Sequence, residues 1–327
     1  MIISRTPLRM SFAGGGSDIS SYYRNYGGAV VSTAIDKYVY VNVNKKFDSG
    51  IRVGYSKNEE VSSVDEIEHR IVRESLRYLN IDGGLEITTI ADIPSKGTGL
   101  GSSSTFTVGL LHALNAYEGN YISSDELAKI ACKIEIEKCG EPIGKQDQYA
   151  AAYGGFNLIT FNQDDTVTVN PIICKRETIV EIEKNILVFY TGITRSASNL
   201  LKKQTEDLRD DVNKQKIMQQ MVGLAYELAG ELQKNNYASF GEILHQGWKL
   251  KKSIANEISN QDIDFWYESA RSAGAVGGRI LGAGAGGFLM LYAPSELHEQ
   301  IKNKLKELQH VKVNFDQLGS RIIFFSH

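Results

Sequence analysis

The chain has 327 residues, of which 42% are hydrophobic, and its formal net charge at pH 7 is -3. The length predicts two lobes, and the composition is typical of a globular protein with an ordinary core. Because Lys and Arg are scattered along the chain and no apolar run reaches membrane-spanning length, we expect neither a nucleic-acid partner nor a membrane partner.

The cysteines and histidines give no sign of a disulfide framework or a structural metal. Cys132, Cys139 and Cys174 form an odd count without a CxxC pair, and the six histidines show no HxxxH spacing. The N-terminal residues contain neither a long apolar segment nor a signal-peptide cleavage site. These features are typical of a reduced protein without zinc, so we expect a cytoplasmic location.

The first half of the chain contains strand and helix patterns in turn. Residues 7–18, PLRMSFAGGGSD, are predicted to begin with a strand, and residues 37–47, KYVYVNVNKKF, alternate as a strand does. Residues 84–94, GLEITTIADIP, predict a further strand that a proline ends. Residues 123–140, SSDELAKIACKIEIEKCG, repeat apolar side chains at helical spacing, with Ser124 as the expected cap.

The second half predicts a helical stretch followed by two strands around a glycine loop. Residues from about 196 to 250 are mostly helical by composition, with lysine and glutamine side chains on faces exposed to water. Residues 277–294 predict strand, glycine loop and strand, and a helix and a final strand follow. Together these elements predict an α+β protein with two lobes, residues 1–170 and residues 171–327.

The loop at residues 94–105, PSKGTGLGSSST, is predicted to bind an anion. It lies between a strand that ends at Asp92 and a helix that starts near Ser102, so backbone N–H groups and a positive helix end point at one place. A turn with serine caps is the simpler alternative, but the loop holds more glycine and hydroxyl groups than a cap requires. It lacks the Gly-Lys-Ser/Thr ending of a Walker A motif. The candidate nucleotide-binding residues are Lys96, Gly97, Thr98, Gly99, Leu100, Gly101, Ser102, Ser103, Ser104 and Thr105.

A second glycine cluster, GAGAGG at residues 282–287, matches the G-x-G-x-x-G pattern of dinucleotide-binding proteins. That fingerprint must open a helix, yet the residues that follow, FLMLYAP, predict a buried strand. No acidic residue follows where a ribose ligand is expected. The cluster therefore predicts a glycine hairpin that closes on an active site, with candidate residues Gly282, Gly284, Gly286 and Gly287.

A third cluster, at residues 7–18, places the cation Arg9 on a strand and the carboxylate Asp18 beyond three glycines. The glycines would let a polyhydroxyl substrate lie against the backbone, and Asp18 would accept hydrogen bonds from its hydroxyl groups. The alternative is that Asp18 only caps a turn or helix. The candidate substrate-binding residues of this cluster are Gly14, Gly15, Gly16, Ser17 and Asp18.

In this order, PLRMSFAGGGSD, PSKGTGLGSSST and LGAGAGGFLM resemble motifs one, two and three of the GHMP small-molecule kinases, a family that includes galactokinase, homoserine kinase and mevalonate kinase. FAGGGSDI joined to GEPIGKQDQYAAAYGGFN is similar to the branch that phosphorylates D-glycero-D-manno-heptose 7-phosphate. The resemblance implies a two-lobed fold with the active site in the cleft, ATP as phosphate donor, Mg²⁺, and a sugar phosphate as acceptor.

The resemblance also leaves alternatives for the function. A heptose 7-phosphate kinase would form the 1,7-bisphosphate, a step toward nucleotide-activated heptose for surface glycans. The first alternative is an anomeric kinase for another sugar, such as fucose or galactose, and the second is a catalytically silent sensor that binds sugar and nucleotide. We expect a monomer or a homodimer.

Roles for single residues follow from the family pattern. Ser103 matches the magnesium ligand of motif two, and Glu135 is the expected carboxylate partner. Glu137 is the alternative, because we expect one extra residue, relative to the family pattern, between this helix and Asp147. Asp147 matches the catalytic base, and Arg9 is expected beside it and the γ-phosphate, where a cation offsets charge on the transferred group.

The acceptor is expected to contact polar residues next to the base and a cation at the far end of the site. Gln146 is the first of these. Arg195, in TGITRSASN after the predicted strand ILVFY, is the candidate for the 7-phosphate, with Lys145 and Arg24 as its rivals.

Overall fold

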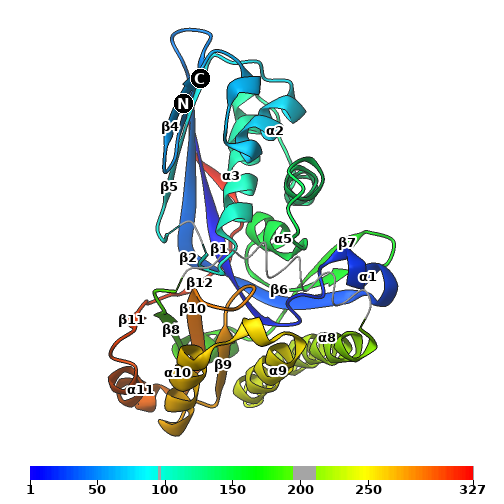
Figure 1. Ribbon diagram of the computed structural model, residues 1–327, viewed down its shortest axis with the longest axis vertical. Coiled ribbons are helices and arrows are strands. Elements are labelled where there is room, and N and C mark those ends of the chain that lie inside the picture. Colours follow the sequence, from blue (N-terminus) through cyan, green and yellow to red (C-terminus); the bar gives the residue numbers. More distant parts are fainter. Residues whose placement is uncertain (95–96, 194–210, 327) are drawn as a thin grey trace.

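The computed structural model describes residues 1–94, 97–193 and 211–326, and within them two β-sheets form the framework of the protein (Figure 1). The larger sheet has the order β13 (Arg321–Phe325), β1 (Ile2–Ala13), β2 (Gly28–Lys45), β5 (Leu85–Ala91), β3 (Ile51–Gly54) and β4 (Asn58–Val61). Two further strands, β12 (Phe315–Asp316) and β6 (Phe156–Phe161), also pair with β2, and β7 (Val167–Pro171) pairs with β6. The smaller sheet has the order β11 (Gln309–His310), β8 (Ile186–Tyr190), β10 (Phe288–Tyr292) and β9 (Gly277–Ile280).

The strands expected from the sequence are confirmed, and β2 is longer than expected. Residues 37–47 alternate because this part of β2 has one buried and one more exposed side. Residues 28–35 are buried on both sides, so they show no alternation and the pattern misses them. The strand expected at residues 84–94 is β5.

The helices around the larger sheet include the two that matter most for the site, α3 and α5. In Figure 1, α2, α3 and α5 lie on the same side of this sheet, and α3 packs against β1 and β2. The helical elements of this part are α1 (Ser20–Tyr26), η1 (Val64–Glu66), α2 (Arg70–Leu79), α3 (Ser102–Tyr117), α4 (Ser124–Cys132), the π-helical turn η2 (Lys133–Lys138) and α5 (Gln146–Tyr153).

The expected helix at residues 123–140 is present as α4 followed by η2, with one correction at its start. The cap is Ser123 rather than Ser124, since the Ser123 hydroxyl accepts a hydrogen bond from the Glu126 N–H at 3.2 Å. Both serines fit the sequence pattern, and only the backbone shows which of them lies outside the helix.

Helices also cover the smaller sheet, and two of them contact the larger one. The elements are α6 (Arg176–Lys184), α8 (Val212–Gln233), α9 (Phe240–Ile254), η3 (Asn256–Ile258), α10 (Gln261–Ser272), η4 (Ser295–Leu297) and α11 (His298–Lys304). The helical stretch expected up to residue 250 is confirmed from residue 212 onward, whereas residues 196–210 lie outside the described residues. Helices α8 and α9 pack against β1, so the two lobes share a core.

That shared core is aromatic at its centre. Phe12 at the end of β1 lies 5.3 Å from Phe156 and 5.2 Å from Phe240, measured between ring centroids. Phe240 belongs to α9 of the second lobe, so this cluster fixes the end of β1 against the smaller lobe.

The chain passes between the two sheets twice. It leaves the larger sheet after β7, forms the smaller sheet, and returns through β12 to β13, which pairs with β1 from Ile2–Phe325 to Arg5–Arg321. The chain ends are therefore adjacent in Figure 1, and the Met1 amino group donates to the Ser326 carbonyl at 2.7 Å. The domain boundary expected near residue 170 falls at the end of β7 and stays a prediction.

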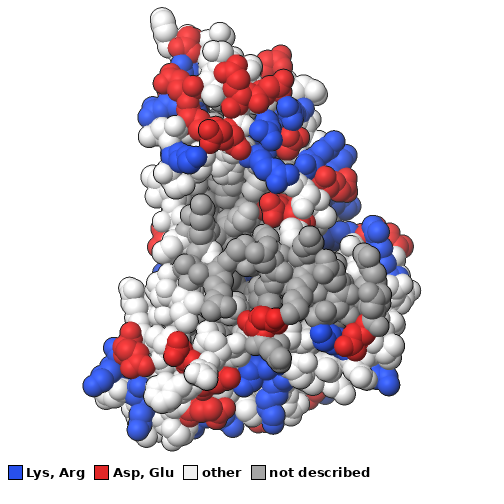
Figure 2. Space-filling view, in the orientation of Figure 1, with Lys and Arg blue, Asp and Glu red and all other residues white. Residues whose placement is uncertain are grey.

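On the face drawn in Figure 2, the Lys and Arg side chains of the described residues are interspersed with Asp and Glu. None of the helices in the described ranges is long and apolar enough to cross a membrane. The three cysteines are free thiols, of which Cys132 and Cys139 are buried.

Candidate active site

A cavity of about 220 Å³ opens where four segments meet: the end of β1, the start of α3, the start of α5 and the hairpin between β9 and β10. The sequence-predicted residues that line it are Arg9, Gly15, Gly16, Asp18, Gly97, Thr98, Gly99, Gly101, Ser102, Ser103, Ser104, Glu135, Gln146, Asp147 and Gly282. Three glycine clusters that lie far apart in the sequence thus share one cavity.

Several other predicted residues support this cavity from behind. Ser17 donates to the Gly14 carbonyl at 2.8 Å, and Thr105 donates to the Pro7 carbonyl at 3.4 Å. Leu100 is buried in the core. The predicted residues that pack behind the lining are Gly14, Ser17, Leu100, Thr105, Gly284, Gly286 and Gly287. Lys96 and Arg195 lie outside the described residues.

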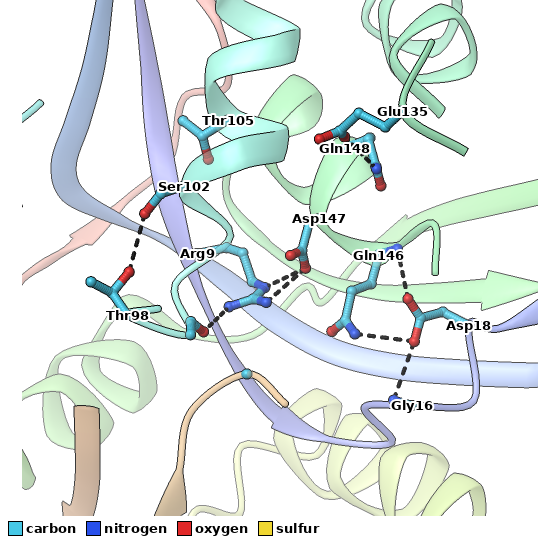
Figure 3. Close-up of polar contacts among 12 residues, drawn as sticks. Arg9, Gly16, Asp18, Thr98, Ser102, Thr105, Glu135, Gln146, Asp147 and Gln148 are labelled. Carbon is cyan, nitrogen blue, oxygen red and sulfur yellow. Dashed lines mark hydrogen bonds and ion pairs between the residues drawn. The ribbon is translucent and has the colours of Figure 1, made fainter. Parts of the chain in front are cut away.

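Arg9 and Asp147 form an ion pair at the centre of the cavity (Figure 3). The Arg9 Nη2 and Nε atoms lie 2.7 Å and 2.8 Å from Asp147 Oδ1, and Nη1 donates to the Gly99 carbonyl at 2.7 Å. Arg9 is 3% exposed, so its hydrogen bonds fix the guanidinium and hold the carboxylate in one orientation. Arg9 therefore connects the loop before α3 to the start of α5.

Asp18 and Gln146 form a second polar pair beside Asp147. Asp18 Oδ2 accepts from the Gln146 backbone N–H at 3.0 Å, and Oδ1 accepts from Gln146 Nε2 at 3.1 Å and the Gly16 N–H at 3.2 Å. Burial raises the pKa of the Asp18 carboxyl above its ordinary value, while the backbone hydrogen bond from Gln146 acts in the opposite direction. Asp18 thus ties the loop at residues 14–16 to α5.

Ser103 and Glu135 face each other across the start of α3. The Ser103 hydroxyl donates to Glu135 Oε1 at 3.0 Å, and Gln148 Nε2 donates to Oε2 at 2.6 Å. Burial raises the pKa of Glu135 to about 7, although hydrogen bonds from Ser104, Gln148 and Ser103 lower it in part.

The π-helical turn η2 explains the choice between Glu135 and Glu137. The Cys139 N–H donates to the Ile134 carbonyl at 2.8 Å, five residues back, so this turn holds one residue more than an α-turn. As a result Glu135 is fully buried next to Ser103, whereas Glu137 is exposed.

The start of α3 carries no side-chain cap. Its N-cap residue is Gly101, with a φ of 78°, and no side chain bonds to the first turn as a cap. The Ser102 hydroxyl instead lies 3.1 Å from that of Thr98, and Ser103 bonds to Glu135. The serine-capped turn considered above is therefore absent, and the positive helix end faces the cavity.

Sequence reasoning missed two cations at this site, Lys251 on α9 and Arg279 on β9. Lys251 lines the cavity and is 3% exposed, while Arg279 is 1% exposed behind the loop at residues 14–16. Lys251 stands in the run KLKK, which looks like a water-facing helix surface. Nothing in that local pattern shows that α9 turns this lysine toward the cleft. The other missed lining residues are Ser11, Ile19, Glu141, Ile143, Gly144 and Ala283.

The rival cations Lys145 and Arg24 do not line the cavity. Lys145 Nζ lies 3.0 Å from Asp165 Oδ1, and Arg24 Nη2 lies 2.5 Å from Asp165 Oδ2. Both cations therefore share one carboxylate at the protein surface.

Phosphoryl transfer requires groups that place the reactants and neutralise charge. This cavity offers such groups: an uncapped helix start, a glycine loop, hydroxyl groups, an arginine and carboxylates. The fold and site thus define a small-molecule phosphotransferase. Two family models match the chain, the GHMP kinases N terminal domain at residues 67–155 and the GHMP kinases C terminal domain at residues 228–310. The chain belongs to the GHMP kinase family, whose members use ATP as phosphate donor.

Similar proteins include enzymes that act on sugars. The chain is 32% identical to D-glycero-alpha-D-manno-heptose 7-phosphate kinase of Campylobacter jejuni, with 95% of each chain covered. A solved structure of a D-glycero-D-manno-heptose 1-phosphate kinase from Bacteroides thetaiotaomicron is 27% identical, with a TM-score of 0.81 and 100% of each chain covered. Galactokinase of Pyrococcus furiosus is 25% identical over 88% of this chain and 87% of that protein.

Proposed function

We propose that this protein transfers the γ-phosphoryl group of ATP to the anomeric hydroxyl of D-glycero-D-manno-heptose 7-phosphate. The product would be heptose 1,7-bisphosphate, for nucleotide-heptose and surface glycan biosynthesis. The observation that carries the proposal is that the Arg9–Asp147 pair and the start of α3 line the same cavity. The similarity to the C. jejuni kinase, which covers 95% of both chains, supports the choice of substrate.

The nucleotide phosphates would bind at the start of α3. The glycines of the 94–105 loop permit close approach of the backbone, and the helix end favours negative charge. Arg9, which already bonds to the Gly99 carbonyl in this loop, would contact the γ-phosphate and offset the charge that develops during transfer.

The Ser103–Glu135 pair fits a magnesium ion. Mg²⁺ prefers oxygen ligands and is held in kinases by one or two protein groups together with the nucleotide phosphates. Ser103 Oγ and Glu135 Oε1 are 3.0 Å apart at the mouth of the phosphate loop, which gives two oxygen donors on one side of the cavity. When bound, the ion would neutralise charge on the β- and γ-phosphates. The described residues contain no cluster of three or more acidic, histidine or cysteine side chains that could hold a metal, so the ion would rely on Ser103, Glu135 and the nucleotide.

The acceptor sugar would lie over residues 14–16, between Asp18 and Asp147. Asp18 and Gln146 would bind its hydroxyl groups, and Asp147 would accept the proton of the anomeric hydroxyl. As the new bond from that oxygen to the γ-phosphorus forms, the bond from the γ-phosphorus to the β,γ-bridging oxygen breaks and ADP leaves. The proton passes from Asp147 to solvent after transfer. Arg9 holds Asp147 in the orientation that this step needs.

The small-molecule partners would then be ATP and a sugar phosphate, in a cytoplasmic protein that is a monomer or a homodimer. Two alternatives compete with this proposal. An anomeric kinase for fucose or galactose would use the same groups, and the P. furiosus galactokinase is a more distant relative than the C. jejuni heptose kinase. A silent sensor would bind both ligands without transfer, but the presence of Arg9, Ser103 and Asp147 in one cavity favours an active enzyme.

A panel of sugars and sugar phosphates with a coupled ADP assay tests the proposal. Heptose 7-phosphate should release ADP, whereas free heptose, fucose and galactose should not. One similar protein is a heptose 7-phosphate kinase and another is a heptose 1-phosphate kinase. The panel therefore also includes heptose 1-phosphate. Turnover of a free hexose alone would favour the first alternative, and nucleotide binding without turnover of any panel member would favour the sensor.

A further inference from the structure

Two buried cations beside the loop at residues 14–16 form no ion pair with any residue that the structure describes. Lys251 and Arg279 are 3% and 1% exposed. Lys251 Nζ donates to the Gly282 carbonyl, and Arg279 Nη1 donates to the Phe12 carbonyl at 3.1 Å. The Nε and Nη2 atoms of Arg279 are buried and find no hydrogen-bond partner in the described ranges. Neither of these two cationic side chains thus has an ion-pair partner in the part of the chain that the structure describes.

Several polar atoms converge on one point above Gly15. A Cβ atom placed on Gly15 would lie 3.8 Å from Arg279 Nη2, 3.8 Å from Gln146 Oε1 and 3.8 Å from Ser11 Oγ. Gln146 Oε1 is itself buried and unpartnered among the described residues. Gly15, Gln146 and Ser11 all line the cavity, as does Lys251. The unpartnered donor Arg279 Nη2 therefore lies next to the part of the cavity at residues 14–16.

The neighbouring acids balance these cations only in part. Asp147 is paired with Arg9, which leaves Asp18 to face two cations, and the charge of Asp18 acts on Lys251. Burial lowers the pKa of Lys251 well below its ordinary value, and the nearby charges of Arg279 and Arg9 lower it further. Burial likewise lowers the pKa of Arg279 to about 10. A buried charge is costly unless an opposite charge and hydrogen bonds compensate it, so an anion bound here would relieve that cost.

We propose that Lys251 and Arg279 bind a phosphate monoester carried by the acceptor substrate. This inference rests on the proposed function, and it assigns the phosphate of the sugar to the cleft face of α9 and β9. Arginine and lysine together supply several charged N–H donors, which is the usual protein environment of a phosphate dianion. Arg195, the sequence-based candidate, lies outside the described residues and stays a separate prediction.

The position of the two cations favours the acceptor over the nucleotide as the source of the phosphate. In Figure 3 the Arg9–Asp147 pair lies between Thr98 and Ser102 on one side and Gln146 and Asp18 on the other. The first side is the start of α3. Arg279 contacts the second side through the space above Gly15. Lys251 bonds to the Gly282 carbonyl, and its charge interacts with Arg279 and with Asp18 on that second side. A phosphate on the acceptor would be held there, away from the transferred group.

The kinetic test compares Lys251→Met with Lys249→Met, an exposed lysine on the same helix. With heptose 7-phosphate and ATP, Lys251→Met should raise the KM for the sugar phosphate about tenfold to a hundredfold, the effect of one lost hydrogen bond between charged groups. The KM for ATP should change less than about twofold, and Lys249→Met should match the wild type. Arg279→Lys, which keeps a cation but loses the fork of donors, should raise the same KM.

A binding test separates the two sources of phosphate and does not depend on turnover. Calorimetric titrations of wild type, Lys251→Met and Lys249→Met use four probes: heptose 7-phosphate, free heptose, inorganic phosphate and the nonhydrolysable ATP analogue AMPPNP. Lys251→Met should weaken binding of the first and third probes only. Circular dichroism and thermal melting establish that each variant is folded.

Each outcome decides the inference. If Lys251→Met binds heptose 7-phosphate and inorganic phosphate as tightly as the wild type, the inference is wrong. If only AMPPNP binding weakens, the cations serve the nucleotide and the acceptor assignment is overturned. Suppose that the wild type does not phosphorylate heptose 7-phosphate, but that Lys251→Met binds inorganic phosphate more weakly than the wild type does. The anion site is then supported and the proposed substrate is wrong. If the wild type neither turns over the sugar phosphate nor binds inorganic phosphate, both fail.

Discussion

Gly282 lies directly against Gly99: a Cβ atom on Gly282 would be 2.4 Å from the Gly99 Cα atom. Conversely, a Cβ atom on Gly99 would be 2.2 Å from the Leu281 carbonyl oxygen. The glycine loop of the first lobe and the glycine hairpin of the second are thus in backbone contact. This contact supports the carbonyl of Gly99 that Arg9 binds.

Gly282→Ala should therefore separate the two lobes at the cavity. Gly282 has a φ of 72°, so alanine adds the cost of a left-handed conformation to a clash with backbone atoms, in total about 2–4 kcal/mol of unfolding free energy. Gly119→Ala is the matched control, because Gly119 has a φ of 74° and no described heavy atom within 4 Å of its Cβ position. That control should cost only about 1–2 kcal/mol. Urea unfolding measures the loss of stability, and the KM for ATP measures the effect on the cavity. Equal losses of stability in Gly282→Ala and Gly119→Ala would contradict the contact.

Asp147→Asn should lower kcat by about 10²–10⁴ while leaving nucleotide affinity close to that of the wild type. The amide keeps the shape of the side chain but cannot accept the proton of the acceptor hydroxyl. Asp164→Asn, at an exposed aspartate that bonds only locally to Thr166, is the control and should retain full activity. Steady-state kinetics with a nucleotide-binding titration checks this, and near-normal turnover would remove Asp147 from the catalytic role.

Glu135 should make folding stability depend on pH. Its pKa is raised by burial from 4.5 to about 7, so the folded state holds this proton more tightly than the unfolded state. The resulting stability is fully present below pH 4.5 and is lost as pH rises toward about 7, by roughly 3 kcal/mol. Glu135→Gln should abolish this part of the pH dependence. Urea unfolding of the metal-free protein at several pH values tests this, and parallel pH profiles for wild type and variant would disprove it.

The same carboxyl should link magnesium binding to proton release. A metal ion needs the ionised carboxylate, so binding of Mg²⁺ with AMPPNP near pH 6 should release a proton from Glu135. Calorimetry in buffers of different ionisation enthalpy measures that proton. Glu135→Gln should release none and should require a higher Mg²⁺ concentration for half-saturation, whereas Glu137→Gln, at the exposed position, should match the wild type. Proton release that persists in Glu135→Gln would exclude Glu135 as the ligand.

Much of the fold could be predicted from local patterns. Alternation predicts the outer half of β2 and all of β5, and the helix starting at Ser102 is where the glycine loop places it. The inner half of β2 could not be found in this way, since strands buried on both sides do not alternate. The pairing of β13 with β1 is also invisible locally, because it joins residues from opposite ends of the chain.

The parts of the site formed by glycine-rich and hydroxyl-rich motifs could be predicted from the order of those motifs in the sequence. Its buried cations could not. The proximity of Arg9 to Asp147 follows from the family pattern and is confirmed by their ion pair. Lys251 and Arg279 were missed, because an isolated lysine or arginine gives no local sign that tertiary packing will bury it. The choice between Glu135 and Glu137 was open in the sequence, and only the π-helical turn shows which of them is buried beside Ser103.

The return of β13 to the edge of β1 has a consequence for biosynthesis. Ile2 pairs with Phe325, so this edge of β1 stays unpaired until β13 has been synthesised, although its other edge can already pair with β2. Such distant pairing slows folding and leaves a strand edge open to other chains in the meantime. We expect nascent chains of this protein to need protection from aggregation until β13 is available.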